Sequence, residues 1–337
     1  MGHSRHTGRL LNAVIFLLPF AAAIVCIGIG RYHLSPLESF RVLAAAVTGG
    51  EVEATAWSVV INVRLPRILL ALSVGAGLAV SGASFQSLFS NPLATPDTLG
   101  VATGASFGAV MALLISDNLL TVQFFALAMG LLALLVTCTI SRLNGKSSII
   151  MVVLAGIVVS SLFEALVSLM KYVADPEEDL PTITYWLMGS MSKATLKGIA
   201  VGIPLIIAGI LILFLLRWRL NILSLNEDEA RSLGVNVKRL RLIVMAAATL
   251  VTASGVSMCG QVGWVGLLIS HAARMIYGSD NRKIIPASIC LGAAFMVVID
   301  TAARAATAAE IPVSILTAII GAPFFIILLR KTGGAKL

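Results

Sequence analysis

Long apolar runs separated by short polar segments dominate this sequence. A membrane-spanning helix needs about 20 mostly apolar residues. Ten runs approach or exceed that length, near residues 10–30, 67–89, 98–116, 121–140, 148–172, 197–216, 240–259, 263–277, 284–303 and 313–329. The run at 263–277 is the shortest, and we expect it to span only part of the bilayer. The pattern predicts an all-α polytopic membrane protein, a single domain of about ten transmembrane helices.

The amino-acid composition also indicates a membrane protein, whose surface is in contact with lipid. Hydrophobic residues make up 58% of the 337 positions and charged residues only 12%, whereas soluble domains average about 25% charged residues. The net charge of +8 is spread between the apolar runs rather than clustered on one face. We therefore expect no nucleic-acid partner.

Basic residues give the orientation of the chain. Arg5 and Arg9 precede the first run, which is longer than the apolar part of a signal peptide, so we expect a retained helix. If the N-terminus is cytoplasmic, about two-thirds of the 24 Lys and Arg residues fall on the cytoplasmic side. This predicts that both termini are cytoplasmic, that 31–66 forms an extracytoplasmic loop, and that 217–241 is a cytoplasmic segment.

Two runs carry small residues at four-residue spacing. Small residues at this spacing let helix backbones approach closely within a membrane. We expect helix packing here, and a place beside a pore is the alternative. The stripes are Ala71, Gly75, Ala79 and Ala83, and Gly100, Gly104 and Gly108.

The sequence shows no pattern of an enzyme or of a cofactor site. It contains no GxxxxGK[ST], HExxH or GxSxG motif, so we expect neither ATP hydrolysis by this chain nor a hydrolase site. The four cysteines lack metal-ligand spacing, and we expect no metal or cofactor. Glu164 and Asp300 are acidic residues within apolar runs. Such residues are usually functional, which leaves an ion-coupled secondary transporter as an alternative.

The cytoplasmic segment 217–241 contains a short amphipathic stretch. Asn226 and the acids after it are typical of a helix start, and Gly234 is typical of a helix end. An interfacial anchor and a docking element for a cytosolic partner both fit this pattern.

Several motifs together resemble the FecCD-type permeases of ABC importers. The stretch EARSLGVNV (229–237) resembles the coupling segment of that family, and Arg64 to Arg67 match its RLPR motif. The other matching stretches are GAGLAVSGASFQSLFSNPLATPDTLGVATGAS (75–106), YWLMGS (185–190), GQVGWVGLLISHAAR (260–274), GSDNRKIIPAS (278–288) and EIPVSILTAIIGAPFFIILL (310–329). Two positions depart from the family pattern, Ser270 before His271 and Asn281 before Arg282.

The resemblance implies a cobalamin-importer-like permease fold in the bacterial cytoplasmic membrane. Family members work as two permease subunits with two cytosolic ABC ATPase subunits and an extracytoplasmic solute-binding protein. We therefore expect a homodimer that moves an iron chelate (a siderophore complex), haem, a corrinoid or a related substrate along the interface between the copies. The sequence leaves the choice among these substrates open.

The matched motifs and the predicted topology together predict three groups of functional residues. The coupling residues, which contact the ATPase, are Glu229, Ala230, Arg231, Leu233 and Gly234. We expect Asn91 and Leu93 to form the cytoplasmic gate, with Ser147 and Ser148 as weaker members; a plain turn at residues 91–94 is the alternative. The binding-protein docking residues are Arg64, Arg67 and Arg304, which we expect to be exposed on the outer face; snorkelling to lipid phosphates is the alternative for them.

Overall fold

The computed structural model describes residues 2–116, 118–141, 149–224, 227–307 and 309–332, and every regular element in these ranges is a helix. Within these ranges, seven helices are long and apolar enough to cross a membrane. Three shorter apolar helices in the same ranges bring the number to the ten expected, which confirms the predicted fold class. In chain order the elements are α1 (Gly2–Gly28), α2 (Pro36–Thr48), α3 (Ala54–Trp57), η1 (Ser58–Arg64), α4 (Leu65–Leu88), η2 (Pro96–Leu99), α5 (Val101–Leu113), α6 (Leu119–Ile140), α7 (Ile149–Val173), α8 (Asp179–Leu187), α9 (Leu196–Leu215), η3 (Arg219–Ser224), α10 (Glu227–Ser232), α11 (Val237–Cys259), α12 (Val265–Tyr277), α13 (Asn281–Ala305) and α14 (Val313–Thr332).

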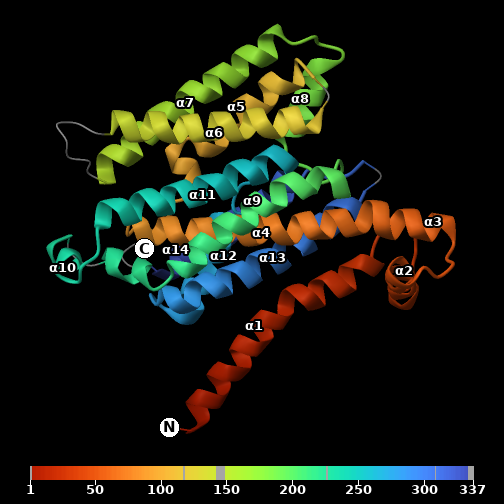
Figure 1. Ribbon diagram of the computed structural model, residues 1–337, viewed down its shortest axis with the longest axis horizontal. Coiled ribbons are helices and arrows are strands. Elements are labelled where there is room, and N and C mark those ends of the chain that lie inside the picture. Colours follow the sequence, from red (N-terminus) through yellow and green to blue (C-terminus); the bar gives the residue numbers. More distant parts are fainter. Residues whose placement is uncertain (1, 117, 142–148, 225–226, 308, 333–337) are drawn as a thin grey trace.

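Helix α4 lies at the centre of the bundle (Figure 1). It contacts α9, α11, α12 and α13, and 78% of the residues in its most apolar stretch are buried. Helices α5, α6 and α7 pack on one another in a layer to one side, with α11 between them and α4. Only 28% of the corresponding stretch of α7 is buried, so α7 is peripheral in the single chain.

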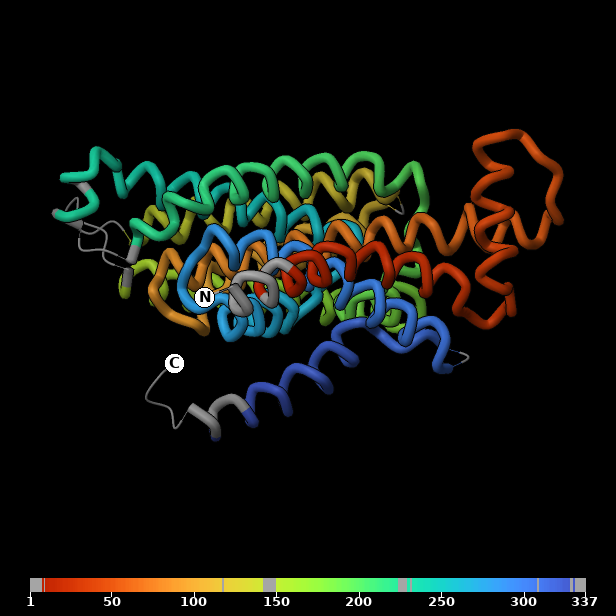
Figure 2. Tube along the Cα trace, turned by 90° about the horizontal axis from the view of Figure 1, so that it is seen from below, coloured from red at the N-terminus to blue at the C-terminus, as the bar shows by residue number. Residues whose placement is uncertain are grey.

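The two ends of the bundle carry different short helices. Helix α10 projects at one end, and α2 and α3 lie at the other (Figures 1 and 2). We call these the α10 end and the α2 end. A hydrogen bond of 3.1 Å from the Asn221 side chain to the Asp280 carboxylate places the turn between α12 and α13 at the α10 end. Figure 2 also shows α14 leaning away from the other helices, on which it packs through α12 and α13.

Glycines allow α4 to touch its neighbours at the backbone. A Cβ atom added to Gly75 would clash with the carbonyl oxygen of Gly292 on α13. One added to Gly82 would clash with Gly266 on α12. The predicted small-residue stripe on this helix therefore serves helix packing within one chain, as expected for a membrane bundle.

The second small-residue stripe divides into two roles. Gly104 and Gly108 lie on α5 against the backbone of α6, where a Cβ on Gly108 would clash with Phe125. Gly100 instead ends η2 with a φ of 76°, a left-handed conformation that favours glycine. Gly100 is also closely packed, since an added Cβ would lie 3.2 Å from the backbone nitrogen of Ser160 on α7, so the predicted close packing holds for all three glycines.

The segment 31–66, expected as a loop, is largely helical. Ser35 and Glu38 form a reciprocal capping box at the start of α2, which fixes that helix at the surface. Residues 58–64 form the π-helical segment η1, which runs directly into α4. The second apolar helix therefore begins before residue 67, because η1 continues into α4 and buries Val60 and Ile61 against the bundle.

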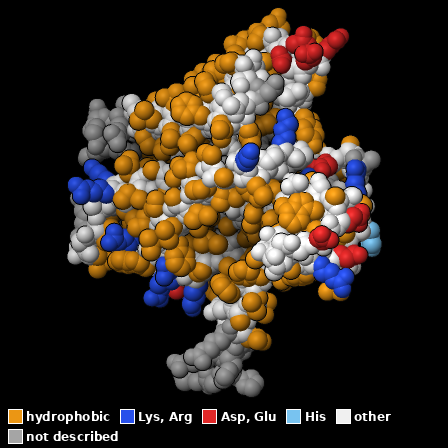
Figure 3. All heavy atoms as spheres, turned by 45° about the vertical axis from the view of Figure 1, so that its right-hand side comes forward, with side chains coloured by type: hydrophobic (Ala, Val, Ile, Leu, Met, Phe, Trp, Pro, Cys, Tyr) orange, Lys and Arg blue, Asp and Glu red, His pale blue; other side chains and the backbone are white. Residues whose placement is uncertain are grey.

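Apolar side chains cover much of the face shown in Figure 3, and charged side chains lie mainly toward its edges. Helix α1 alone exposes Val14, Phe16, Leu17 and Phe20, each by 54% or more. Of the four cysteines, Cys26 and Cys259 are buried, and Cys138 and Cys290 are half-buried. This surface matches a bundle surrounded by lipid rather than water.

We expect Gly75→Val to destabilise the protein strongly. The new side chain must displace the backbone of α13, and overpacking of this kind typically costs about 1–3 kcal/mol or more. The measurement is the thermal unfolding midpoint of the purified chain in detergent. Gly255→Ala is the matched control, since its Cβ would lie 3.8 Å from Val74, an ordinary contact. Equal midpoints for the two variants would contradict the close packing of α4 on α13.

Candidate functional site

At the α2 end, Arg67 on α4 joins two acidic residues. Its Nη2 donates to Oδ1 of Asp300 on α13 at 2.8 Å, and its Nη1 donates to Oε1 of Glu310 at 2.7 Å. The side chains of Arg67 and Asp300 are 3% and 1% exposed, whereas that of Glu310 is 29% exposed. The guanidinium therefore fastens α4 to α13 and to the segment that precedes α14.

Two further arginines hold the end of α1 against the same cluster. Arg64 donates to the carbonyl oxygens of Ile27, at 2.6 Å, and Tyr32, at 2.5 Å. Arg304 donates to the carbonyl oxygen of Cys26 at 2.6 Å, and its Nε lies 3.9 Å from Oδ2 of Asp300. Gly30 packs directly on both guanidinium groups, because an added Cβ would lie 2.7 Å from Arg64 and 2.9 Å from Arg304.

The predicted docking residues are thus brought together, but they are not exposed. Arg64, Arg67 and Arg304 are 2%, 2% and 7% exposed. Their expected exposure is wrong for this conformation, because each guanidinium donates to carbonyl or carboxylate oxygens of the same chain, although the Nε of the buried Arg304 has no hydrogen-bond partner among the described residues. Whether a binding protein docks through them stays a prediction.

At the α10 end, α4 stops at Leu88 and the chain turns sharply. Ser90 has a φ of 47°, and the Asn91 side chain accepts a hydrogen bond from the Leu93 amide at 2.9 Å. Leu93 is 45% exposed, so the turn presents an apolar side chain. Asn91 and Leu93 therefore lie together, while Ser147 and Ser148 fall outside the described residues. The gating role of all four stays a prediction.

Arg274 on α12 binds the last turn of α4, a contact that our sequence reasoning did not identify. It donates to the carbonyl oxygen of Ala83 at 3.0 Å, to Ser87 at 2.8 Å and to the Gln86 side chain at 2.9 Å. An arginine inside an apolar run was the available signal. Arg274, Gln86, Ser87 and Asn91 line a cavity of about 430 Å³.

The two departures from the family motifs have local structural roles. Ser270 is fully buried, and its hydroxyl donates to the carbonyl oxygen of Gly266 one turn earlier. Asn281 is also buried, and its side chain accepts a hydrogen bond from Ser87 at 2.7 Å. Asn281 thus joins α13 to the end of α4.

The predicted coupling segment forms a short helix outside the bundle. In α10, Ala230 is 1% exposed and Leu233, just beyond the helix, is 59% exposed. Gly234 has a φ of 74° and open space around it, so it ends the helix as expected. Glu229 is exposed, and the side chain of Arg231 lies outside the described residues. Ala230 therefore contacts the bundle while Leu233 faces outward.

The two acidic residues of the ion-coupled alternative occupy different sites. Asp300 is paired with Arg67, which accounts for its burial. Glu164 lies exposed on α7, on a face with Ser161 and Ser168 among exposed apolar residues. The described residues hold no group of three His, Cys, Asp or Glu side chains that could bind a metal ion.

Comparisons with known proteins agree with this arrangement. The profile of the FecCD transport family matches residues 17–331. The molybdate import system permease protein MolB of Haemophilus influenzae is 40% identical, over 94% of each chain. The cobalamin import system permease protein BtuC of Halobacterium salinarum is 39% identical, over 88% of this chain and 79% of the relative. A solved metal-chelate type ABC transporter in an inward-facing conformation has a TM-score of 0.86 and 38% identity, covering 96% of this chain and 99% of the other.

The fold and these matches define an ABC importer permease of the metal-chelate type. The chain belongs to the FecCD transport family.

We expect Arg67→Ala to destabilise the chain by about 3–5 kcal/mol, because it leaves the Asp300 carboxylate buried without its main partner. The thermal unfolding midpoint in detergent measures the effect. Arg41→Ala removes an exposed arginine of α2 and is expected to cost at most about 0.5 kcal/mol.

The combined variant Arg67→Met, Asp300→Asn should be more stable than Arg67→Met alone. The second substitution replaces the buried carboxylate that would otherwise lack its partner with a neutral amide. A double variant as unstable as the sum of its single changes would show that the ion pair is not the source of the effect.

Proposed function

We propose that the chain is the membrane-spanning subunit of a binding-protein-dependent importer for an iron chelate, haem, a corrinoid or a related substrate. Two copies would pair in the bacterial cytoplasmic membrane, with both termini in the cytoplasm. Two cytosolic ABC ATPase subunits and an extracytoplasmic solute-binding protein would complete the assembly. Substrate would move by alternating access along the interface between the copies.

The observation that carries this proposal is α10. It lies outside the apolar bundle, yet the buried Ala230 fixes it to the bundle. The apolar side chain of Leu233 is exposed, and the space next to Gly234 is open, so both residues are accessible to a partner. An ATPase surface that closes on these two residues would transmit force to α11, which begins three residues later.

The exposed face of α7 supports a path between two copies. A carboxylate facing lipid is costly, and such residues normally face a bundle interior or a water-filled space. Glu164, with Ser161 and Ser168 one turn to either side, fits a wall of such a space. A negative wall favours substrates that present cationic or hydrogen-bond-donor groups.

Molybdate is a second candidate substrate, favoured by the 40% identity to a molybdate permease. Glu164 opposes it, since a carboxylate in the path repels a compact oxyanion. The ion-coupled alternative is disfavoured by the pairing of Asp300 with Arg67, which leaves Glu164 without the second acid of that hypothesis.

The docking and gating assignments remain part of the proposal. Arg67 is engaged by Glu310, whose side chain is the most accessible member of the cluster. A carboxylate of the binding protein would reach Arg67 by replacing Glu310, with Arg64 and Arg304 strengthening the positive potential. At the other end, the turn holding Asn91 and Leu93 would narrow the path on the cytoplasmic side.

Reconstituted transport tests the proposal. Proteoliposomes with this chain, its ATPase and its binding protein should take up a ferric siderophore, haem or a corrinoid only when ATP is present, and the chain alone should not hydrolyse ATP. Molybdate supplied in parallel separates the two substrate candidates. Uptake driven by an ion gradient without the ATPase would support the secondary-transporter alternative instead.

We expect Leu233→Asp to weaken association with the ATPase about tenfold or more, because it places a charge where an apolar contact is proposed. The unfolding midpoint should not change, since this side chain is 59% exposed. Association is measured by titrating labelled ATPase into the purified permease. Val47→Asp, at an 89% exposed position on α2, is the control. Unchanged association of the Leu233 variant would refute the coupling role.

We expect Glu310→Gln to strengthen binding-protein association up to about fivefold, because removal of the competing carboxylate frees one charge contact of Arg67. The gain should shrink at high salt, where screening is greater. Glu51→Gln, at an exposed acid of the α2 end, is the control. If both variants bind the partner like the parent protein, docking does not use Arg67.

A further inference from the structure

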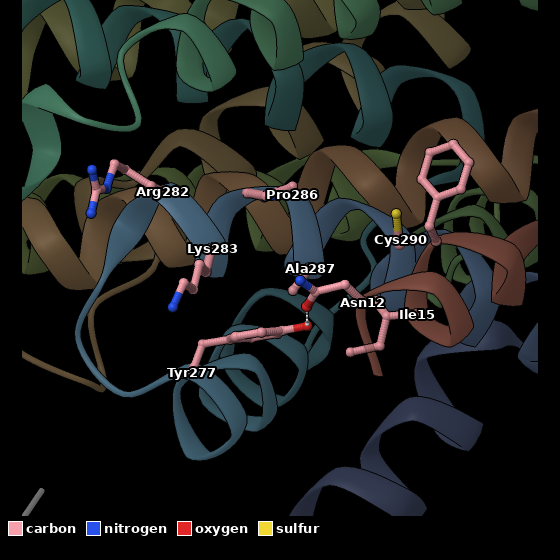
Figure 4. Close-up of a pocket in the computed structure, with 9 residues that line it drawn as sticks. Asn12, Ile15, Tyr277, Arg282, Lys283, Pro286, Ala287 and Cys290 are labelled. Atoms are coloured by element: carbon pink, nitrogen blue, oxygen red, sulfur yellow. Dashed lines mark hydrogen bonds between the residues drawn. The ribbon is translucent and has the colours of Figure 1, made fainter. Parts of the chain in front are cut away.

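A cavity of about 360 Å³ lies between α1 and the α12–α13 turn, away from the groups discussed above (Figure 4). Helix α1 contributes Asn12 and Ile15, α12 contributes Tyr277, and α13 contributes residues from Arg282 to Cys290. In Figure 1 the first half of α1 diverges from the other helices on this side. The cavity is therefore open toward the surroundings of the bundle rather than toward its centre.

One end of this cavity is polar and positive. Arg282 and Lys283 lie in the first turn of α13, where the helix dipole adds positive potential. Arg282 is partly neutralised by Asp280 at 3.2 Å, and the hydrogen bond from Arg282 holds the pKa of Asp280 below its ordinary value. Lys283 has no ion pair among the described residues and is exposed. The net charge at this end is positive.

The opposite end of the cavity is apolar. Ile15 and Ala287 are 7% and 4% exposed, and Cys290 lies beyond them along α13 (Figure 4). Cys290 follows Lys283 by seven residues, which is about 10 Å along a helix. The cavity thus changes from cationic to apolar along the axis of a membrane-spanning helix.

Tyr277 closes the side of the cavity near its polar end. Its hydroxyl donates to the Asn12 side chain at 2.6 Å, which ties α12 to α1 across the opening (Figure 4). The pair is polar and lies at the level where head groups meet acyl chains if the apolar end is in the bilayer core. Tyrosine is enriched at this level of membrane proteins.

We propose that this cavity binds one anionic phospholipid. The phosphate would lie against Lys283 and Arg282, and the start of an acyl chain would run past Ala287 toward Cys290 and Ile15. A soluble anion would leave the apolar half unfilled, and a zwitterionic lipid would gain less from the uncompensated lysine. The bound lipid would fill the space between α1 and α13 and hold α1 on the bundle. Basic pockets between transmembrane helices bind anionic head groups elsewhere for the same reason.

Native mass spectrometry of the full-length chain, purified in detergent in its native assembly, tests the proposal. Titration with phosphatidylglycerol should give tighter binding than titration with phosphatidylethanolamine of the same acyl chains. Lys283→Gln should weaken phosphatidylglycerol binding by roughly fivefold, the factor expected for one basic residue near an anionic surface. Arg282→Gln should weaken it less, because Asp280 already offsets that charge. Lys238→Gln, at an exposed lysine near the start of α11 that does not line the cavity, should have no effect.

Maleimide labelling of Cys290 locates the lipid. In a Cys138→Ala background, Cys26 and Cys259 are 5% and 2% exposed, so Cys290 is the reactive thiol. Phosphatidylglycerol should slow its labelling several-fold, and inorganic phosphate should not. Protection by phosphate alone would identify a site for a soluble anion. Equal binding of the two lipids by the parent and the Lys283 variant would identify ordinary annular lipid. Either result overturns the proposal.

Discussion

Backbone contact along α4 is the constraint on which the rest of the structure depends. In a bilayer no hydrophobic driving force brings apolar helices together, so close packing and polar contacts must do so. Gly75 and Gly82 let α13 and α12 approach α4 without intervening side chains. At its two ends, Arg67 and the Gln86–Ser87 pair fasten α4 to α13 and to Arg274 of α12. Helices α4, α12 and α13 therefore form one body from the α2 end to the α10 end.

This arrangement identifies the less constrained parts of the molecule. Only 28% of the apolar stretch of α7 is buried, α14 leans away from the bundle, and α1 diverges from it. A transporter that changes shape during its cycle needs elements held by fewer contacts. The Glu310 contact is relevant here, because it is the accessible link between the α4–α13 body and the segment that leads into α14. If a partner bound at the α2 end breaks the Arg67–Glu310 ion pair, the segment before α14 loses this contact with α4, and α14 is then less constrained.

Much of the fold could be predicted from the sequence because lipid imposes simple rules. The lengths of the apolar runs gave the helices, and four-residue spacing identified Gly75, Gly104 and Gly108 as packing positions. Residues 31–66 were missed, since their polar character hides α2 and the π-helical extension of α4. The burial of Arg64, Arg67 and Arg304 was also missed. Their acceptors lie at Ile27, Asp300 and Cys26, far away in sequence, and no local pattern reports such pairing. Arg274 lies inside an apolar run, which was a local signal, but its partners from Ala83 to Ser87 are also far away in sequence.

The central claim is that this chain is half of a two-fold permease, driven through α10 by a separate ATPase. A cryo-electron microscopy structure of the chain purified with its ATPase, without nucleotide, tests it most directly. The account predicts two copies related by a two-fold axis, an ATPase subunit in contact with Leu233 of each copy, and Glu164 facing a space between the copies. A single copy, or an α10 that contacts nothing while Glu164 faces lipid, would contradict it.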